Sequence, residues 1–207
     1  EWTHKYLNGT IFLLWFTSRK PNVNYAGFDV FLSLSKSNIR HFIELCHIAL
    51  KKAKNISDSC LVIEQEAQAL AAKEAANYFF EETKSSGIKG NHLFSLISTL
   101  GNIFQYSQQR YSQSEFERTH FSIENGNADI SAEANELLQE AVKWSVLYAE
   151  DETKIKNERL TSFEYTLNPI YAPFFNISYR KGRKLELSSR QAEALLTGTE
   201  MEKQGLF

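Results

Sequence analysis

The sequence contains little cysteine, proline or methionine, and it has no long hydrophobic run. Two cysteines, Cys46 and Cys60, are too few for a disulfide scaffold and lack the C-x-x-C spacing of a zinc or redox motif. With three prolines and nine glycines, the 207-residue chain is neither collagen-like nor low-complexity. Its longest apolar run, residues 11–16, is far shorter than the roughly 20 residues of a membrane-spanning helix. We therefore expect a packed globular protein without a membrane partner.

Other absences limit the classes of function that the chain can have. A net charge of −2 argues against a uniformly basic nucleic-acid-binding surface. The chain has no P-loop, no nucleophile elbow and no H-E-x-x-H motif, and no nucleophile–base pair can be named, which disfavours a stand-alone enzyme. His41 and His47 would lie about 120° apart on a helix, so we expect no metal. The few cysteines and the lack of a visible signal peptide indicate a cytoplasmic protein.

Hydrophobic periodicity predicts a mainly helical chain with a small β component. The expected helices cover residues 1–16, 27–34, 39–54, 63–84 and 91–108, followed by one helix after Ser131 and a short final one after Ser188. The expected strands cover residues 120–125, 146–150 and 162–167. The polar residues 35–38 offer an N-cap for the helix over 39–54.

The helix over residues 39–54 is strongly two-sided. One stripe carries only apolar residues and cysteine: Ile39, Phe42, Ile43, Cys46 and Leu50. The opposite side carries Arg40, Glu44, His47 and Lys51. We expect the first stripe to face the core and the second to face solvent.

The second half of the chain predicts a winged-helix-like domain. Its elements run helix, strand, helix and then a two-stranded hairpin, although one helix is missing between the first strand and Ser131. Glycines at positions 87 and 90 punctuate the chain before this series. We therefore divide the chain into a helical segment, residues 1–86, and a winged-helix-like domain with a C-terminal extension, residues 87–207.

A basic segment near the C-terminus is a candidate nucleic-acid contact, consisting of Arg180, Lys181, Arg183 and Lys184. Basic residues in a wing or tail commonly bind phosphate oxygens without reading sequence. A solvated turn between two short strands explains the same residues. The helix after Ser131 carries Glu133, Glu136 and Glu140 against Lys143, which disfavours a major-groove recognition helix and favours docking to a protein.

Two blocks of sequence carry a family resemblance. Residues 25–46, YAGFDVFLSLSKSNIRHFIELC, resemble the lid region of bacterial origin-recognition-like AAA+ ATPases, a group with suggested roles in defence. Residues 163–175, FEYTLNPIYAPFF, continuing to Arg180 and then to residues 185–188, resemble the end of the same proteins. Ser37 stands where such families have glycine, which is a small departure.

The resemblance implies a fold and a role for one residue. It implies an AAA+ lid-like segment in which Arg40 matches the sensor-2 arginine, which reaches the γ-phosphate of ATP in the parent protein. An exposed Arg40 paired with Glu44 is the alternative. Because the chain begins at Glu1 and its only methionine is Met201, we expect an ATPase core upstream.

We therefore expect the C-terminal regulatory part of a larger AAA+ ATPase, not itself an enzyme. Its expected partners are that upstream core and either duplex DNA or other protein subunits. The alternative is a protein-docking module of a multi-domain defence protein that makes no direct contact with DNA.

Overall fold

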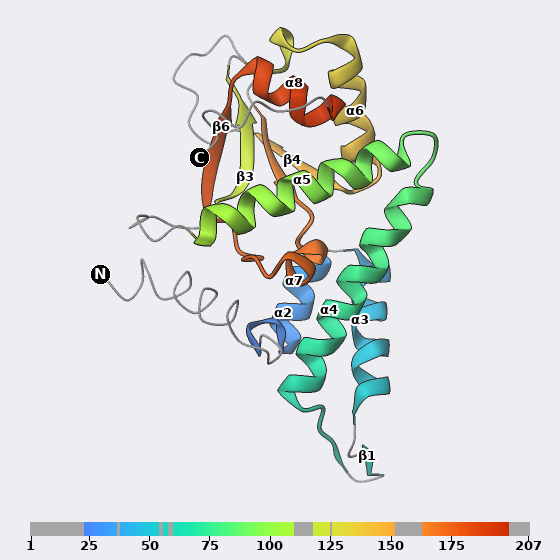
Figure 1. The fold of residues 1–207 in the computed structure, drawn as a ribbon. Helices are drawn as coiled ribbons and strands as arrows, with labels where there is room; N and C mark the ends of the chain where they lie inside the picture. The colour runs from blue at the N-terminus through green and yellow to red at the C-terminus, as the bar shows by residue number, and fades with distance from the viewer. Residues whose placement is uncertain are drawn as a thin grey trace, which may run out of the picture.

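The computed structural model of this chain describes residues 23–36, 38–53, 56–57, 60–109, 118–124, 126–151 and 163–198. They form a mainly helical protein with a small four-stranded sheet, which confirms the expected fold class (Figure 1). The helix expected over residues 1–16 lies outside the described residues. Among the described helices, none combines the length and the apolar character needed to cross a membrane.

The described part of the helical segment contains α-helices that match the expected ones closely. A short 3-10 turn, η1 (Val23–Tyr25), leads into α2 (Phe28–Ser35). Helix α3 (Ile39–Lys52) begins after Asn38, whose side chain caps it. Two short strands, β1 (Ile56–Ser57) and β2 (Cys60–Leu61), form a hairpin before α4 (Gln65–Glu82) returns alongside α3 (Figure 1).

The buried face of α3 differs from the expected one. Ile39, Ile43 and Leu50 are 69%, 58% and 40% exposed, so the expected core stripe is wrong for these three residues. The residues that α3 buries are His41, Leu45, Ile48 and Ala49. Helix α4 buries six alanines and two phenylalanines, and small side chains allow its neighbours to approach closely on more than one side. Packing against α4 and α2 therefore decides the rotation of α3.

The second half contains the expected helices and strands with small shifts of their ends. A 3-10 turn, η2 (Thr83–Ser85), leads into this half. Its elements are α5 (Gly90–Gln109), β3 (Arg118–Ile123), α6 (Ala132–Lys143), β4 (Leu147–Asp151), β5 (Phe163–Leu167), β6 (Arg183–Leu187) and α8 (Ser189–Thr197). Ser131 caps α6, and Ser188 with Gln191 forms the expected capping box of α8. Among the described residues between β3 and α6, the one helical element is a 3-10 turn, η3 (Gly126–Asp129).

The sheet has the strand order β4-β5-β3-β6. Strand β5 pairs antiparallel with both β4 and β3, whereas β6 adds to the other edge of β3 in parallel. Phe121 and Ile123 of β3 share one buried face, as their alternation predicts. Helices α5, α6 and α8 pack on one another and against this sheet (Figure 1).

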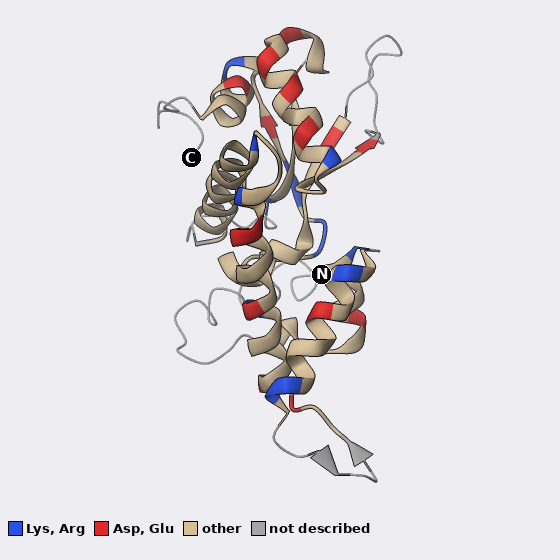
Figure 2. Ribbon diagram, turned by 90° about the vertical axis from the view of Figure 1, so that its right-hand side faces the viewer, with Lys and Arg blue, Asp and Glu red and all other residues tan. Residues whose placement is uncertain are grey.

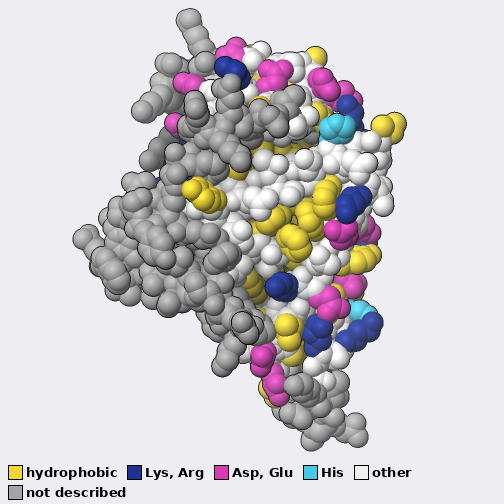
Figure 3. Space-filling model, in the orientation of Figure 1, with side chains coloured by type: hydrophobic (Ala, Val, Ile, Leu, Met, Phe, Trp, Pro, Cys, Tyr) yellow, Lys and Arg dark blue, Asp and Glu magenta, His cyan; other side chains and the backbone are white. Residues whose placement is uncertain are grey.

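A short segment after β5 joins the sheet to the helical segment. It comprises η4 (Pro169–Tyr171) and α7 (Ala172–Phe175), and it packs against α4. The ring of Phe80 on α4 stacks on Phe94 with a centroid distance of 4.2 Å and lies 4.7 Å from Phe174 and 5.7 Å from Phe175. On the face shown in Figure 3, hydrophobic side chains gather where α4 and α5 meet.

The same segment is tied to the start of the described chain. The hydroxyl of Tyr25 donates a hydrogen bond of 2.6 Å to the carbonyl of Ile177 and lies 3.2 Å from the carbonyl of Ala172. Buried residues from both halves therefore form one continuous hydrophobic cluster. The boundary near Gly87 stays a prediction, and a separate second domain would have to fold without these contacts.

We expect Gly101→Ala to destabilise the protein even though alanine favours helices over glycine by roughly 0.5–1 kcal/mol. A Cβ at this position in α5 would lie 2.5 Å from three ring atoms of Phe175. That ring is buried against Phe80 and Phe174, so it cannot move aside freely. Overpacking of this kind costs about 1–3 kcal/mol, which outweighs the helix gain.

Denaturant unfolding followed by circular dichroism measures this effect. Asn102→Ala is the matched control, because Asn102 is the next residue of α5 and is exposed. We expect the control to leave stability unchanged or slightly higher. A rise in stability for Gly101→Ala would contradict the close packing of α5 on α7.

Candidate functional site

Arg40 lies in the first turn of α3, where the sequence analysis places it. Its backbone N–H and that of His41 donate to Oδ1 of Asn38 at 3.0 and 3.4 Å, so the N-cap already satisfies these two groups. The guanidinium reaches across to α4 and forms an ion pair with Glu82. The alternative considered from the sequence, a pair with Glu44 one turn along the same helix, is therefore replaced by a pair with Glu82 of α4.

Two aromatic residues of α4 complete the surroundings of the guanidinium. Its Nη2 donates to the hydroxyl of Tyr78 at 3.3 Å, and its Cζ lies 5.3 Å from the ring centroid of Phe79. The hydrogen bond to Glu82 raises the pKa of Arg40, which keeps the side chain charged. The Arg40 side chain is 59% exposed, so it remains accessible to an anion.

Arg40 borders a polar cleft of about 370 Å³ where the two halves of the chain meet. This volume falls within the range of small-molecule sites. One wall comes from the start of α3 and the end of α4, and the other from the end of α6. Its polar and aromatic lining includes Glu82, Ser85, Ser86, Lys143, Trp144 and Tyr171.

His41 lines the same cleft but is 92% buried, since only 8% of its surface is exposed. The amide nitrogen of Asn38 lies 3.4 Å from its Nε2 and can only donate, which leaves the proton on Nδ1. Nδ1 is buried without a hydrogen-bond partner among the described residues. Burial, followed by the charge of Arg40, lowers the pKa of His41 to about 4, so the ring is neutral at pH 7.

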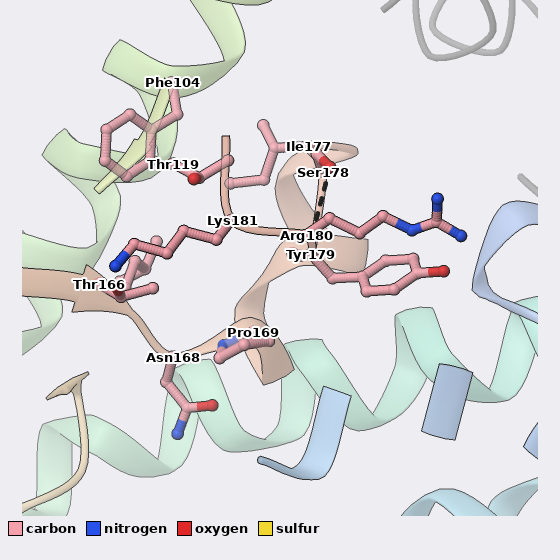
Figure 4. Close-up of a pocket in the computed structure, with 12 residues that line it drawn as sticks. Phe104, Thr119, Thr166, Asn168, Pro169, Ile177, Ser178, Tyr179, Arg180 and Lys181 are labelled. Atoms are coloured by element: carbon pink, nitrogen blue, oxygen red, sulfur yellow. Dashed lines mark hydrogen bonds between the residues drawn. The ribbon is translucent and has the colours of Figure 1, made fainter. Parts of the chain in front are cut away.

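The side chains of the basic segment near the C-terminus point in two directions. Arg180 and Tyr179 point one way and Lys181 points the other, as Figure 4 shows. The backbone N–H of Arg180 donates to the hydroxyl of Ser178 at 3.3 Å, and the guanidinium lies 5.7 Å from the ring centroid of Tyr179. Arg183 and Lys184 follow at the start of β6, and Lys184 pairs with Glu186 at 3.2 Å.

Lys181 connects two carboxylates of the sheet. Its Nζ lies 2.7 Å from Glu164 and 2.9 Å from Glu150, and the hydrogen bond to Glu164 raises its pKa. Glu150 also accepts from Lys36, at the end of α2, at 3.0 Å. These contacts link α2, β4, β5 and the segment before β6. Lys181 therefore contributes to the fold, and its charge is largely neutralised.

Lys181 and Lys36 favour the ionised form of Glu150. Hydrogen bonds from Lys181 and then Lys36 lower the pKa of Glu150 from 4.5 to about 2. On β3, His120 is buried with its Nε2 3.7 Å from Glu164 of the adjacent β5, and burial lowers the pKa of His120. This surface of the sheet is a balanced ionic network rather than a basic patch.

A small cavity lies behind the basic segment. Its volume is about 20 Å³, enough for roughly one water molecule, and Thr166 Oγ1 on its wall is buried without a hydrogen-bond partner among the described residues (Figure 4). It is too small for a cofactor. Within the described ranges, no three His, Cys, Asp or Glu residues are placed to bind a metal, and Cys46 is a free thiol whose pKa burial raises.

Helix α6 presents acidic residues along its length, as Figure 2 shows. Glu133 lies in its first turn, Glu136 pairs at 3.6 Å with Lys89, which lies just before α5, and Glu140 pairs with Lys143 at 2.8 Å. Glu140 also accepts from the indole nitrogen of Trp144 at 2.9 Å. The helix that follows Ser131 therefore has an anionic outer surface, which DNA phosphates would repel.

Several residues that line the cleft or contact Arg40 were missed in the sequence analysis. Glu82 and Tyr78 lie about forty positions from Arg40, and Lys143 and Trp144 lie more than a hundred away. The periodicity predicted their helices, but no local pattern indicated that these helices meet at Arg40. Only the packing of α3 on α4, with the end of α6 on the other side of the cleft, brings them together.

The chain matches the family model described as ORC-CDC6-like over residues 1–187, which is most of its length. It therefore belongs to the ORC-CDC6-like family. This membership supports an origin-recognition-like protein related to AAA+ ATPases, as the two sequence blocks indicate. No curated protein and no solved structure gives a significant match.

We expect Glu150→Gln to weaken the pH dependence of stability in acid. The folded-state pKa of Glu150, about 2, lies below its ordinary value of 4.5. Its ion pairs therefore stabilise the folded chain fully above pH 4.5, and this contribution is lost as the pH falls towards 2. The variant lacks the ionisable group, so its melting temperature should fall less steeply across this interval.

Melting curves between pH 2 and 7 test this expectation. Glu66→Gln is the control, since it removes an exposed carboxylate from the first turn of α4, away from the sheet. The control should follow the wild-type slope. A wild-type slope for Glu150→Gln as well would mean that the ionic network does not contribute to acid sensitivity.

Proposed function

We propose that this chain is the regulatory C-terminal part of a larger AAA+ ATPase. In this proposal the nucleotide-binding core lies upstream of the chain, and Arg40 contacts the terminal phosphate of the ATP that it holds. The chain itself carries out no hydrolysis. The observation that carries the proposal is the position of Arg40, charged and accessible in the first turn of α3 beside a cleft of about 370 Å³.

The chemistry of this position supports a nucleotide contact. A guanidinium offers paired donors that match phosphate oxygens, and charge-assisted hydrogen bonds are the strong ones. Helix N-termini also favour negative charge. Membership of the ORC-CDC6-like family over residues 1–187 is consistent with such a role.

The second half supports a winged-helix-like assignment. Its elements follow the order α5, β3, η3, α6, β4 and β5, and the hairpin strand β5 returns to pair with β3. The 3-10 turn η3 occupies the place of the helix that the sequence lacks. Strand β6 and helix α8 then form the proposed C-terminal extension.

For this domain we propose weak, sequence-independent contact with duplex DNA. Arg180, Arg183, Lys184 and Lys181 are the proposed phosphate contacts. Lys181 is engaged by Glu150 and Glu164 and Lys184 by Glu186, so these two lysines should contribute less. The acidic surface of α6 favours the second candidate function, a docking module for another protein subunit. In either case we propose a cytoplasmic protein with a role in bacterial defence.

We expect Arg40→Ala in the parent protein to weaken ATP-dependent activity by about ten-fold or more while leaving the fold intact. A hydrogen bond to a charged group contributes roughly 1.5–3 kcal/mol, and each 1.4 kcal/mol corresponds to a factor of ten. Steady-state ATPase rates and nucleotide affinity measure the loss. Lys51→Ala, which removes another exposed charge from α3, is the control and should behave as wild type.

An ATP-bound structure of the parent protein decides the same question directly. The proposal requires Arg40 to lie within hydrogen-bonding distance of the terminal phosphate. A guanidinium that points away from bound nucleotide would overturn it.

We expect weak binding of this chain to duplex DNA with a steep dependence on salt. Each neutralised phosphate contributes a slope of roughly −0.9 in log K against log salt concentration. Replacing Arg180, Arg183 and Lys184 by alanine should therefore flatten the slope by up to about 3 units. Fluorescence anisotropy over a salt series measures it, with alanine at Lys51, Lys52 and Lys73 as a control of equal charge.

Two results would change the assignment. If the chain fails to bind DNA even at low salt, the domain is a protein-docking module. A sequence-specific footprint would show that an element other than the acidic α6 reads bases.

A further inference from the structure

The guanidinium of Arg40 is held on α4 by neighbouring side chains. Tyr78 and Glu82 lie one turn apart on α4, with Tyr78 Oη 3.5 Å from a carboxylate oxygen of Glu82. Both bind the same nitrogen of Arg40, and the ring of Phe79 lies beside its Cζ. In the structure, a carboxylate and a hydroxyl of the protein therefore already bind one terminal nitrogen of the guanidinium.

An arriving phosphate has few other donors available at this end of α3. The N–H groups of Arg40 and His41 already donate to Asn38. The second cation of the cleft, Lys143, is paired with Glu140 at 2.8 Å. Besides the hydroxyls of Ser85 and Ser86, the guanidinium is therefore the main donor for an anion in the cleft, and the anion competes with Glu82 for it.

We infer that Glu82 is a positioning residue that holds Arg40 on α4 and competes with the terminal phosphate of a nucleotide for its guanidinium. This inference rests on the proposed function of Arg40. Glu82 would then set how readily Arg40 leaves α4 for a phosphate. A terminal phosphate carries more negative charge than a carboxylate, so it can replace Glu82 as the partner of the guanidinium. This exchange takes place only when nucleotide is bound close to Arg40.

The exposure of the pair makes such an exchange feasible. The side chains of Arg40 and Glu82 are 59% and 35% exposed, so water screens their attraction. Pairs of this kind shift an equilibrium by only about two- to five-fold. A buried pair would hold Arg40 too firmly for a ligand to displace it.

The test uses the whole chain with inorganic tripolyphosphate as the probe. Trp144 lines the cleft, so its fluorescence reports binding once Trp2 and Trp15 are replaced by phenylalanine. We expect Glu82→Gln to bind the probe about two- to five-fold more tightly than the wild type. Glu81→Gln is the matched control, because Glu81 is the adjacent residue of α4, pairs with Lys84 and does not line the cleft.

A double-mutant comparison of Arg40 and Glu82 distinguishes a positioning role of Glu82 from the general effect of removing a negative charge. In an Arg40→Ala background, Glu82→Gln should change probe affinity no more than Glu81→Gln does. The melting temperature of Glu82→Gln should stay close to that of the wild type, because an exposed pair contributes little to stability. Equal affinities for Glu82→Gln and Glu81→Gln, or an effect of Glu82→Gln that persists without Arg40, would overturn the inference.

The outcomes also distinguish this inference from the proposed function. If Glu82→Gln tightens probe binding through Arg40 but Arg40→Ala leaves the ATPase rate of the parent unchanged, Glu82 holds Arg40 and the nucleotide-sensing role fails. If Arg40→Ala slows the parent while Glu82→Gln leaves probe affinity unchanged, the sensing role stands and the inference about Glu82 fails.

Discussion

The stacking of Phe80 against the aromatic rings around it is the interaction on which the rest of this structure depends. Phe80 belongs to α4, Phe94 to α5, and Phe174 and Phe175 to the segment that follows the sheet, so one contact joins three separate parts of the chain. Burial of aromatic side chains supplies a large share of the stability of a core. Because these rings pack together, the end of α4, which forms part of one wall of the cleft beside Arg40, is held against the start of α5 and against α7.

Ion pairs also join the sheet to α2 and to the segment before β6. Lys36 at the end of α2 and Lys181 before β6 both bind Glu150 of β4, and Lys181 also binds Glu164 of β5. The segment that forms a basic cluster in the sequence therefore contains one lysine, Lys181, whose ammonium group is bound by carboxylates of the sheet. The net charge of a short run of residues predicted a binding surface, but the potential at the surface depends on carboxylates that lie far away in the sequence.

The two halves of the chain meet at the cleft beside Arg40, the residue that carries the proposed nucleotide contact. Arg40 and the end of α6 border the same cleft, and the sheet follows directly from α6. A ligand that draws Arg40 away from Glu82 would act at the junction where the helical segment meets the sheet. The acidic surface of α6 lies next to this junction, so a partner bound there would be close to the cleft.

The sequence by itself determined the type and order of most described elements. Asn38, Ser131 and Ser188 cap the helices that they were expected to cap, and the alternation around Phe121 identified the central strand. These features are local, because a cap or a period depends only on residues within one or two turns. Two blocks of sequence also indicated the family that the match over residues 1–187 shows.

Only the tertiary structure decided which faces meet. Helix α3 has an apolar stripe that includes Ile39 and Ile43, yet it buries the face of His41 and Leu45 against its neighbours. That rotation brings Arg40 to Glu82 instead of Glu44. Periodicity measures how apolar each face of a helix is, whereas packing depends on the shapes of neighbours that lie dozens of residues away. The candidate residue was therefore visible in the sequence, but its partners were not.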